Sequence, residues 1–327
     1  MTQAGRTPTF SISIEWENAR FAALERTRRM MRQLRQELIA LPQPPHPPQI
    51  NFLYDRLTID GDLVGRVIGE EFRPDQVPAT VRIIPTDGLR YYEQKNFGAA
   101  RSSGEIVIFL DCDVVPESGW LAAMLSPFDD PAVDVVGGET YVELTGLCSK
   151  AFALFWFFGL RDDATDLRPA TGVLFHTNNV AFRREIFSIH GFPDLSTHRV
   201  QHMVLGDTLQ ALGHGIFCQK RARAAHPYPE TIGYFSARAL HDGRDTVIVA
   251  GLRGGGNRIP WRSVYWNYKS GLTQSFRQIR RRRREVGLGR AGAVVAFSIA
   301  FAYLTLRTIG EAVTLARPNA ISRLFPI

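Results

Sequence analysis

Two acidic residues, Asp111 and Asp113, follow an apolar run and are the residues of this sequence best suited to chemistry. Ile106–Leu110 reads IVIFL, which predicts a strand buried on both faces. Two carboxylates at the carboxyl end of such a strand cost free energy unless a positive group neutralises them. Open α/β sheets bind ligands at that end, so a Mg²⁺ or Mn²⁺ ion held with a phosphate-bearing substrate is the simplest partner. The plainer alternative is a strand that ends in a polar turn.

Strand-like and helix-like patterns alternate along the first two thirds of the chain. Further strands are expected at Phe10–Glu15, Ile50–Tyr54, Val81–Pro85 and Val133–Glu139. Helices are expected at Asn18–Leu41, Tyr91–Ser103 and from Trp120 onward. This order of elements predicts a doubly wound α/β fold. The aromatic segment Phe152–Leu160 is expected in a core, and the wall of an acceptor site is the alternative.

Composition and charge narrow the class of protein. The chain has 327 residues, 45% of them hydrophobic, which is enough for one large or two small domains. Its three cysteines show neither metal-ligand spacing nor a pairing pattern, and the first ten residues lack the apolar core of a signal peptide, so a reduced, cytoplasmic setting is expected. The net charge of +7 suits anionic lipid or a phosphate-bearing substrate. No nucleic-acid-binding motif accompanies it, and we expect no nucleic acid partner.

Motifs in a fixed order surround the acidic pair. The first block is Lys95-Asn96-Phe97-Gly98, then Ser102-Ser103-Gly104-Glu105, the apolar strand, the acidic pair, Pro116 and Trp120-Leu121. The second block is Thr177–Arg184, Gly191-Phe192-Pro193-Asp194, and Gly206-Asp207-Thr208-Leu209 leading to Gly213. Over about residues 8–230 this set closely resembles the inverting family 2 nucleotide-sugar glycosyltransferases. The resemblance implies an α/β fold of the GT-A type, a doubly wound mixed sheet.

The sequence departs from that family pattern at three places. The first strand ends Glu15-Trp16-Glu17-Asn18 where the family usually has Pro-x-Tyr-Asn, so only Asn18 matches. Gly206 stands where an acid is common, which leaves Asp207 alone. The Gln-x-x-Arg-Trp motif of processive polysaccharide synthases is not found, which favours transfer of a single sugar over chain extension.

The resemblance implies roles on the donor side. Asp113 is expected to coordinate the metal, and Asp111 to contact the ribose, or the metal through a water. Asp55 is expected to accept hydrogen bonds from the base or ribose, and Lys95 and Arg101 to hold the base or phosphates. The alternative for Lys95 and Arg101 is a solvent-facing helix charge. The remaining residues expected near the nucleotide are Glu15, Glu17, Asn18 and Cys112.

The resemblance also implies roles on the acceptor side. Asp207 is the candidate general base that takes the proton of the acceptor hydroxyl, and a helix N-cap is the alternative. His226 follows the strand-like segment Gly215–Arg223 and is a candidate third metal ligand, because imidazole suits such ions. A loop histidine is the alternative for His226.

The last third of the chain combines a basic run with an apolar segment. Arg280–Arg284 is five consecutive arginines, and Ala291–Leu306 is sixteen residues without a charge. As a helix that segment would be about 24 Å long, short of the roughly 30 Å hydrocarbon core. An interfacial or re-entrant helix, with the arginines on anionic headgroups at the cytoplasmic face, therefore fits best. A helix packed on the catalytic domain or on a second subunit is the alternative.

Together these observations predict two regions, a GT-A catalytic domain at 1–235 and a helical, membrane-associating region at 236–327. The expected reaction is metal-dependent, inverting transfer of one sugar from a UDP- or GDP-linked donor to a hydroxyl of a lipid-linked or cell-surface glycan precursor. One alternative is a nucleotidyltransferase, although those enzymes normally carry a Gly-rich basic loop where this chain has Trp16-Glu17-Asn18. The other is a non-catalytic relative that binds a sugar nucleotide or glycan.

Overall fold

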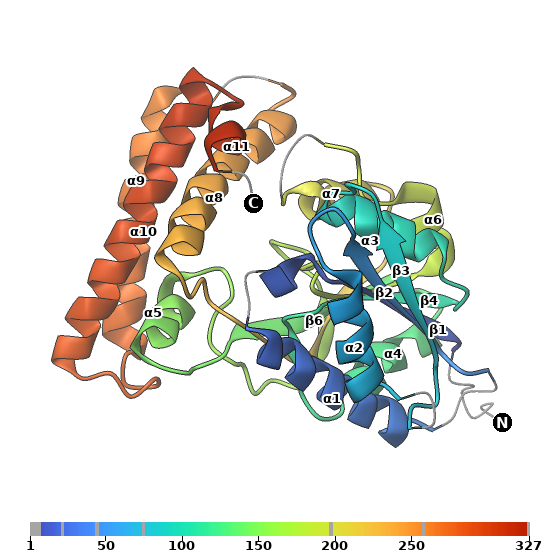
Figure 1. Ribbon diagram of the computed structural model, residues 1–327. Coiled ribbons are helices and arrows are strands. Elements are labelled where there is room, and N and C mark those ends of the chain that lie inside the picture. Colours follow the sequence, from blue (N-terminus) through green and yellow to red (C-terminus); the bar gives the residue numbers. More distant parts are fainter. Residues whose placement is uncertain are drawn as a thin grey trace. The chain divides into compact units, whose positions relative to one another are not determined.

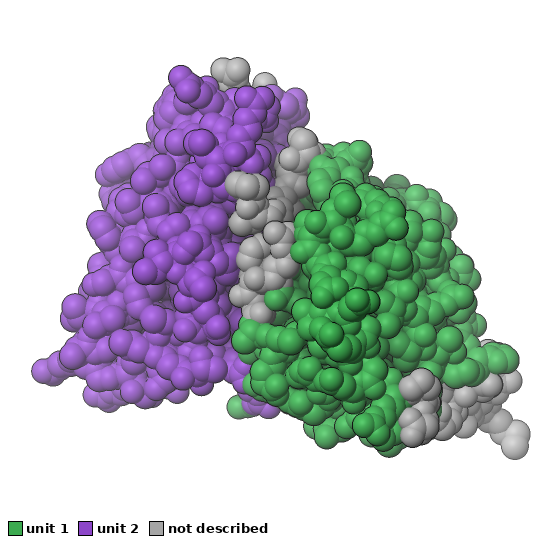
Figure 2. Space-filling model, viewed as in Figure 1, with its two compact units in different colours: residues 1–140, 162–195, 201–226 green, residues 141–161, 196–200, 227–327 purple. Residues whose placement is uncertain are grey.

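A computed structural model describes residues 8–20, 23–42, 46–73, 76–195, 199–256 and 259–325. The chain divides into two units, shown in Figure 2. The first contains residues 1–140, 162–195 and 201–226, and the second contains residues 141–161, 196–200 and 227–327. The second unit thus takes residues 141–161 from within the predicted N-terminal domain, and whether 1–235 and 236–327 fold separately stays a prediction.

One mixed β-sheet organises the first unit. In the described part of the chain it has nine strands in the order β3-β2-β1-β4-β8-β6-β9-β5, with β7 paired to β9. Four strands are parallel: β1 (Phe10–Glu15), β2 (Gln49–Asp55), β3 (Thr80–Thr86) and β4 (Ile106–Asp111). The others are β5 (Val115–Pro116), β6 (Val135–Val142), β7 (Leu167–Pro169), β8 (Asn179–Arg183) and β9 (Ile216–His226). Because β8 runs antiparallel to β4, the sheet is mixed, as predicted.

The helices of this unit lie in the connections between its strands. They are α1 (Leu24–Ala40), α2 (Gly61–Glu71), α3 (Tyr91–Ala100), α4 (Trp120–Leu125), α6 (Arg184–His190), α7 (Gln201–Ala211) and the short 3₁₀ helices η1 (Glu17–Arg20) and η2 (Ser126–Asp129). The chain runs from β1 through β2 to β3 in one direction and returns from β3 to β4 in the other. Since such crossovers are right-handed, α1 and α2 lie on one face of the sheet and α3 on the other.

The order in which the chain adds strands across the sheet changes direction between β1 and β4. Their last residues, Glu15 and Asp111, are partners in the parallel register. In doubly wound sheets the carboxyl ends of two such strands form the crevice that binds a ligand. The topology therefore brings two acidic residues, almost a hundred positions apart in the chain, to the switch point of the sheet.

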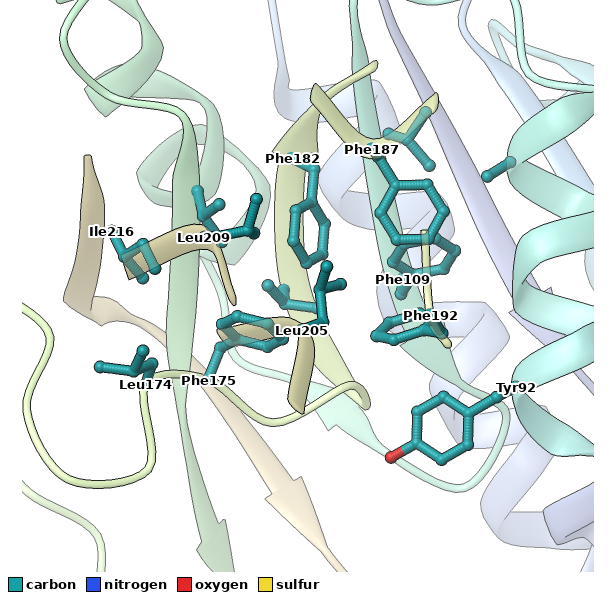
Figure 3. Packing of buried hydrophobic residues seen from close by; sticks show 14 of the residues in the cluster. Tyr92, Phe109, Leu174, Phe175, Phe182, Phe187, Phe192, Leu205, Leu209 and Ile216 are labelled. Atoms are coloured by element: carbon teal, nitrogen blue, oxygen red, sulfur yellow. The ribbon is translucent and has the colours of Figure 1, made fainter. Parts of the chain in front are cut away.

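Strand β4 is buried on both faces, which confirms the prediction from its apolar run. Val107 and Phe109 belong to a core cluster with side chains of α3, α6 and α7, and Figure 3 shows Phe109 among Phe182, Phe187 and Phe192. Ile106, Ile108 and Leu110 are fully buried as well. Because side chains alternate along a strand, Asp111 follows Val107 and Phe109 onto the α3 side of the sheet.

The predicted strands are confirmed, with ends that differ by at most three residues. The first helix differs more: residues Glu17–Arg20 form a 3₁₀ turn and α1 begins only at Leu24, while residues 21 and 22 lie outside the described residues. Helix α2 was not predicted, because Gly61, Gly65 and Gly69 lower its helix propensity. Its sequence signal was the N-cap Asp60, whose carboxylate accepts from Asp62 N.

Several motif residues serve the fold and not the chemistry. Asn96 of α3 donates to Phe192 O and accepts from Phe192 N, which joins the first motif block to the second. Trp120 donates to Asn179 Oδ1 at 2.8 Å and so ties α4 to β8. Gly98 lies where any side chain would collide with Ser13, so α3 can pack closely on β1.

The second unit is helical. Its helices are α5 (Leu147–Phe155), α8 (Ile232–Arg253), α9 (Trp261–Arg282), α10 (Arg290–Ala316) and α11 (Ala320–Leu324). Helix α10 packs between α8 and α9, and the three lie side by side in Figure 1. At the α8–α10 contact a side chain on Gly243 would collide with Arg307 O, and one on Gly310 with Leu240 O. Only glycine therefore allows these two backbones to approach so closely.

The aromatic segment 152–160 lies in the second unit and forms part of its core. Phe152 is buried and its ring contacts those of Tyr228, Phe235 and Tyr303. Phe158 is also buried, whereas Phe157 is half-exposed. The prediction that these rings pack in a core is confirmed for Phe152 and Phe158.

Candidate active site

The carboxyl ends of β1 and β4 hold a cluster of three carboxylates around one amide. The side-chain nitrogen of Asn18 lies 2.8 Å from Asp111 Oδ2, 3.4 Å from Glu15 Oε1 and 3.5 Å from Asp113 Oδ1. All four residues are buried. An amide has only two N–H hydrogens and no charge, so Asn18 organises these oxygens without neutralising them.

Asp111 is held by protein donors on both of its oxygens. Lys95 Nζ donates to Oδ1 at 2.7 Å, Asn18 Nδ2 donates to Oδ2, and the Tyr91 hydroxyl lies 2.9 and 2.8 Å from the two oxygens. Lys95 is 1% exposed and Asp111 is 2% exposed, so the ion pair is dry. Tyr91 also bonds Thr177 Oγ1 at 3.1 Å. Asp111 therefore joins the loop after β1, helix α3 and the segment before β8.

Asp113 lies beside the end of β9 and the candidate ligand His226. Arg26 of α1 donates from Nε to Asp113 O at 2.5 Å and from its Nη2 to Ala225 O at 2.8 Å. Strand β5 pairs Val115 with Ala225 in antiparallel register. The residues one step beyond that pair are Val114 and His226, so the register brings His226 next to the chain at Asp113. The structure thus places together two residues that the sequence separates by more than a hundred positions.

The cluster gathers negative charge at one buried edge of the sheet. Lys95 is the cation paired with Asp111, while Glu15 and Asp113 add two more carboxylates. Burial, and then the charge of Asp111, raises the pKa of Glu15 well above its ordinary value, although Lys95 acts in the opposite direction. A divalent cation would offset the negative charge of these carboxylates. The donor set, all oxygen with imidazole beside it, suits Mg²⁺ or Mn²⁺.

The protein alone does not enclose such an ion. Among the described residues no group of three or more His, Cys, Asp and Glu side chains is arranged to hold a metal. Magnesium commonly binds through one or two carboxylates and completes its shell with substrate phosphates and water. The residues present therefore fit a metal that arrives with a phosphate-bearing substrate, with Asp113 as the carboxylate that would bind it.

Other predicted donor-side residues lie near the switch point with local partners. Asp55 ends β2, and its carboxylate accepts from Leu57 N, Thr58 Oγ1 and Gly88 N at 2.9–3.2 Å, which holds two loops together. Glu17 donates its backbone N–H to Glu15 Oε2 at 2.9 Å. The Cys112 thiol is buried, and burial raises its pKa, so it stays a neutral thiol. A nucleotide contact for Asp55, Glu17 or Cys112 stays a prediction.

Arg101 is the predicted donor-side residue that the structure does not bring to the cluster. It follows the last turn of α3, is exposed, and its guanidinium lies 3.3 Å over the Phe97 ring. Its carbonyl accepts from Gln49, the first residue of β2, which places it at the amino end of the parallel strands. The six residues of β4 then separate it from Asp111, about 16 Å at 3.3 Å per residue. The expectation that Arg101 holds the donor is therefore corrected.

Asp207 lies inside α7, the helix that runs from Gln201 to Ala211. It is the seventh residue of that helix, so the alternative role of helix N-cap is wrong. Leu205 and Leu209 are buried in the core cluster shown in Figure 3. At about 100° per residue, Asp207 projects from the opposite side of α7. Gly206 faces Leu174 and Phe175 closely, which explains why no acid stands there.

The sequence reasoning missed residues that surround Asp111 on the acceptor side. The Tyr91 hydroxyl bonds Asp111 directly, and Thr177 bonds the Tyr91 hydroxyl. The neighbouring Tyr92 hydroxyl lies 2.9 Å from His202 Nδ1, and the His202 and His176 ring centres are 6.1 Å apart. The available signal was helical spacing, because Tyr91 precedes Lys95 by four residues and shares its face of α3. No comparable signal pointed to His176 or His202.

Comparison with known proteins agrees with this geometry. The profile of glycosyl transferase family 2 matches residues 70–190. The match spans more than a third of the chain and covers α3, β4 and β8, with Lys95, Asp111 and Asp113, so this part of the chain is similar to that family. No curated protein sequence matches the chain.

Solved structures confirm the fold. A mannosyltransferase from Pyrobaculum calidifontis, PcManGT, solved with GDP-Man and Mn²⁺, superposes with a TM-score of 0.58 at 14% identity, covering 95% of this chain and 88% of that one. Residues 1–349 of TarS from S. aureus superpose with a TM-score of 0.48 at 11% identity, covering 93% of this chain and 90% of that one. The first likeness confirms the predicted mixed α/β architecture with C-terminal helices.

Replacing Lys95 tests the dry ion pair. Lys95→Met removes the cation that pairs with Asp111, and we expect a loss of about 3–5 kcal/mol in the free energy of unfolding, because a buried charge loses its partner. Arg101→Met is the matched control and should cost under about 1 kcal/mol, since Arg101 is exposed. Denaturant unfolding measures both. Similar losses in the two variants would contradict the assigned role, whereas Lys95→Met/Asp111→Asn should recover part of the stability.

His176 predicts a pH dependence of stability. Burial lowers the pKa of His176 to about 4, below the roughly 6.5 of an unfolded chain. The unfolded state therefore binds the extra proton, and stability falls as pH drops from about 6.5 toward 4, by at most about 1.4 kcal/mol per pH unit. His176→Gln removes this component, so its stability should fall less steeply over that range in urea titrations at several pH values. Parallel curves for the two proteins would contradict the assignment.

Proposed function

We propose that this protein transfers a single sugar from a nucleotide diphosphate sugar to an acceptor hydroxyl, with inversion at the anomeric carbon and with a bound Mg²⁺ or Mn²⁺. The observation that carries the proposal is the buried cluster of carboxylates at the switch point of a sheet that includes the residues matching glycosyl transferase family 2. A UDP- or GDP-linked donor is proposed, and the GDP-Man and Mn²⁺ of the similar mannosyltransferase support that choice.

Donor binding follows from the division of roles between the two aspartates. Asp113 and His226 would hold the metal together with the donor diphosphate, and the metal would act as Lewis acid and template for the departing nucleotide. Asp111, saturated by Lys95, Tyr91 and Asn18, acts as a positioning residue that keeps β4 and α3 in place. A structural role for Asp111 explains why a buried carboxylate is retained beside the metal site.

Acceptor activation needs one general base, because direct attack from the face opposite the leaving group inverts the sugar without a covalent intermediate. The resemblance proposes Asp207 for this role. The geometry favours His202, whose ring is held by the Tyr92 hydroxyl next to Tyr91 and its partner Asp111. Asp207 stands five residues further along α7, about 7.5 Å along the axis and about 140° around it.

The acceptor is proposed to be a lipid-linked or cell-surface glycan precursor, reached at the cytoplasmic face of the membrane. This part of the proposal depends on the basic and apolar character of the C-terminal helices. The residues of the first unit do not by themselves distinguish a membrane-bound acceptor from an acceptor in solution.

A donor panel tests the reaction class. Purified protein with Mg²⁺ or Mn²⁺ and nucleotide sugars should release nucleoside diphosphate, and Asp113→Ala should abolish metal-dependent donor binding in calorimetry. Asp129→Ala, an exposed carboxylate in η2, is the matched control and should bind normally. Release of pyrophosphate would instead indicate a nucleotidyltransferase, and binding without turnover a non-catalytic relative. Unchanged donor affinity in Asp113→Ala would remove Asp113 from the metal site.

Paired variants of α7 identify the base. We expect His202→Asn to keep donor binding and to lower the transfer rate by roughly 10²–10⁴-fold, the usual contribution of a general base. Asp207→Asn should lower it far less, because Asp207 projects from the other side of the helix. The measurement is kcat for transfer to an acceptor, with donor Kd as the folding control. A large loss in Asp207→Asn alone would restore the assignment made from the resemblance.

A further inference from the structure

Helix α9 and its neighbourhood carry an unusual distribution of charge. From Thr246 to Arg284 the sequence has no Asp or Glu and has ten Lys and Arg residues. Most of these cations fall on α9 and the turn that follows it. The catalytic cluster belongs to the other unit, so the proposed chemistry makes no use of this charge.

The cations of α9 form a row along one side of the helix. Lys269, Thr273, Arg277 and Arg281 recur every four residues, and Trp266, Ser270, Gln274 and Gln278 form the adjacent row. Between the rows lies a hollow of about 620 Å³ lined by these eight side chains. Short Ser270 and Thr273 leave the space, while long cationic side chains border it. The lining offers ammonium, guanidinium, hydroxyl and amide donors, which suits an anionic phosphate group.

These cations are not neutralised within the protein. No carboxylate in the described part of the chain pairs with Lys269, Arg277 or Arg281, although the Lys269 ammonium lies 5.0 Å over the Trp266 ring. Two arginines of the run at 280–284 behave differently. Arg282 pairs with Glu285 at 2.9 Å, and Arg283 donates to Leu288 O, so both stabilise the turn between α9 and α10.

Exposed apolar side chains lie on the same pair of helices. Trp266 of α9 is 56% exposed, Phe276 is 52% exposed, and Phe301 of α10 is 48% exposed. Phe276 contacts the ring of Phe297, and Tyr268 that of Phe301, so these side chains lie along the α9–α10 contact. Val294 of α10 is more exposed still, at 67%. Aromatic rings beside cations are the composition of an interfacial helix.

The environment of α10 favours lying on a membrane over crossing it. Within the described residues α10 is the helix long and apolar enough to cross, by length and composition alone. One side of it, however, packs on α8 through Gly243 and Gly310. Tyr303 bonds Asp242 of α8, and the buried Glu311 accepts from Asn267 of α9. The inner side of α10 is polar and packs through glycines, so only the outer side of this helix is left to contact lipid.

We infer that this α9–α10 surface, defined by Trp266, Lys269, Arg277, Arg281, Phe276 and Phe301, docks in the plane of an anionic lipid bilayer, with a lipid phosphate group in the α9 hollow. The charge complementarity selects the partner, because a row of unpaired cations meets lipid phosphates while the adjacent rings enter the interface. This inference deepens the proposed membrane location and is independent of the proposed chemistry.

Vesicle binding by the full chain tests the docking. The protein should sediment with vesicles of mixed phosphatidylcholine and phosphatidylglycerol, far less with phosphatidylcholine alone, and high salt should release it. Arg277→Gln/Arg281→Gln should lower the partition coefficient by about 30-fold, equivalent to about 1 kcal/mol per cation near the surface. Arg66→Gln/Arg82→Gln is the matched control, because it removes the same charge from exposed positions of the first unit and should change binding little. Phe301→Ser should also weaken binding.

Other outcomes overturn the inference. Equal losses in the two double variants would show an effect of net charge and not of this surface. Resistance to alkaline carbonate would show that α10 crosses the bilayer. A dimer that Phe301→Ser converts to a monomer, without vesicle binding, would show that a second copy covers the surface. Nucleoside diphosphate release from the donor, measured on each variant in solution, separates failure of the docking from failure of the proposed catalysis.

Discussion

The pairing of Lys95 with Asp111 is the interaction on which the candidate active site depends. A strand buried on both faces ends in a carboxylate that water does not reach, so a buried cation has to lie beside it. Lys95 supplies that cation from α3, and Tyr91, one helical turn earlier, supplies the hydroxyl. Through Thr177 and Asn18 the same carboxylate also holds the segment before β8 and the loop after β1. One charge thereby orders the residues on both sides of the switch point.

Lys95 neutralises Asp111 within the protein. The neighbouring acids, Glu15 and Asp113, are therefore the candidates for binding a ligand. Glu15 responds to its surroundings with a raised pKa, and Asp113 stands between Asn18 and the end of β9. Lys95 is engaged with Asp111, so in the proposed mechanism Asp111 builds the edge of the sheet and Asp113 binds the metal.

The two units distribute charge in opposite ways. In the first unit the acids converge on a buried edge, and cations such as Arg26 serve backbone carbonyls around it. In the second unit Lys269, Arg277 and Arg281 stand on the surface of α9 without carboxylate partners among the described residues. The first arrangement suits the proposed small cation with its substrate, and the second suits the proposed anionic lipid surface. The single net charge of the chain, +7, conceals this division.

Local patterns were sufficient to predict much of the first unit. The apolar run of β4 and the alternation of strands predicted where the sheet lies, and the position of Asp111 and Asp113 after that run predicted a charged edge. Patterns were insufficient wherever the partner of a side chain decides its role. Lys95 lies in α3 and Arg101 directly follows that helix, yet Arg101 lies at the amino end of the strands and Lys95 reaches the carboxyl end. Helical spacing defines a face, but not the residues that meet it.

The sequence by itself determined where the strands of the parallel part of the sheet lie and that two acids follow the central strand. These are properties of neighbours along the chain, since periodicity and propensity act over a few residues. Only the tertiary structure decided that Lys95 neutralises Asp111, that the pairing of β5 with β9 brings His226 to the chain next to Asp113, and that Tyr92 bonds His202. Those outcomes depend on strand register and helix rotation, because a shift of one residue in either turns a side chain to the opposite face.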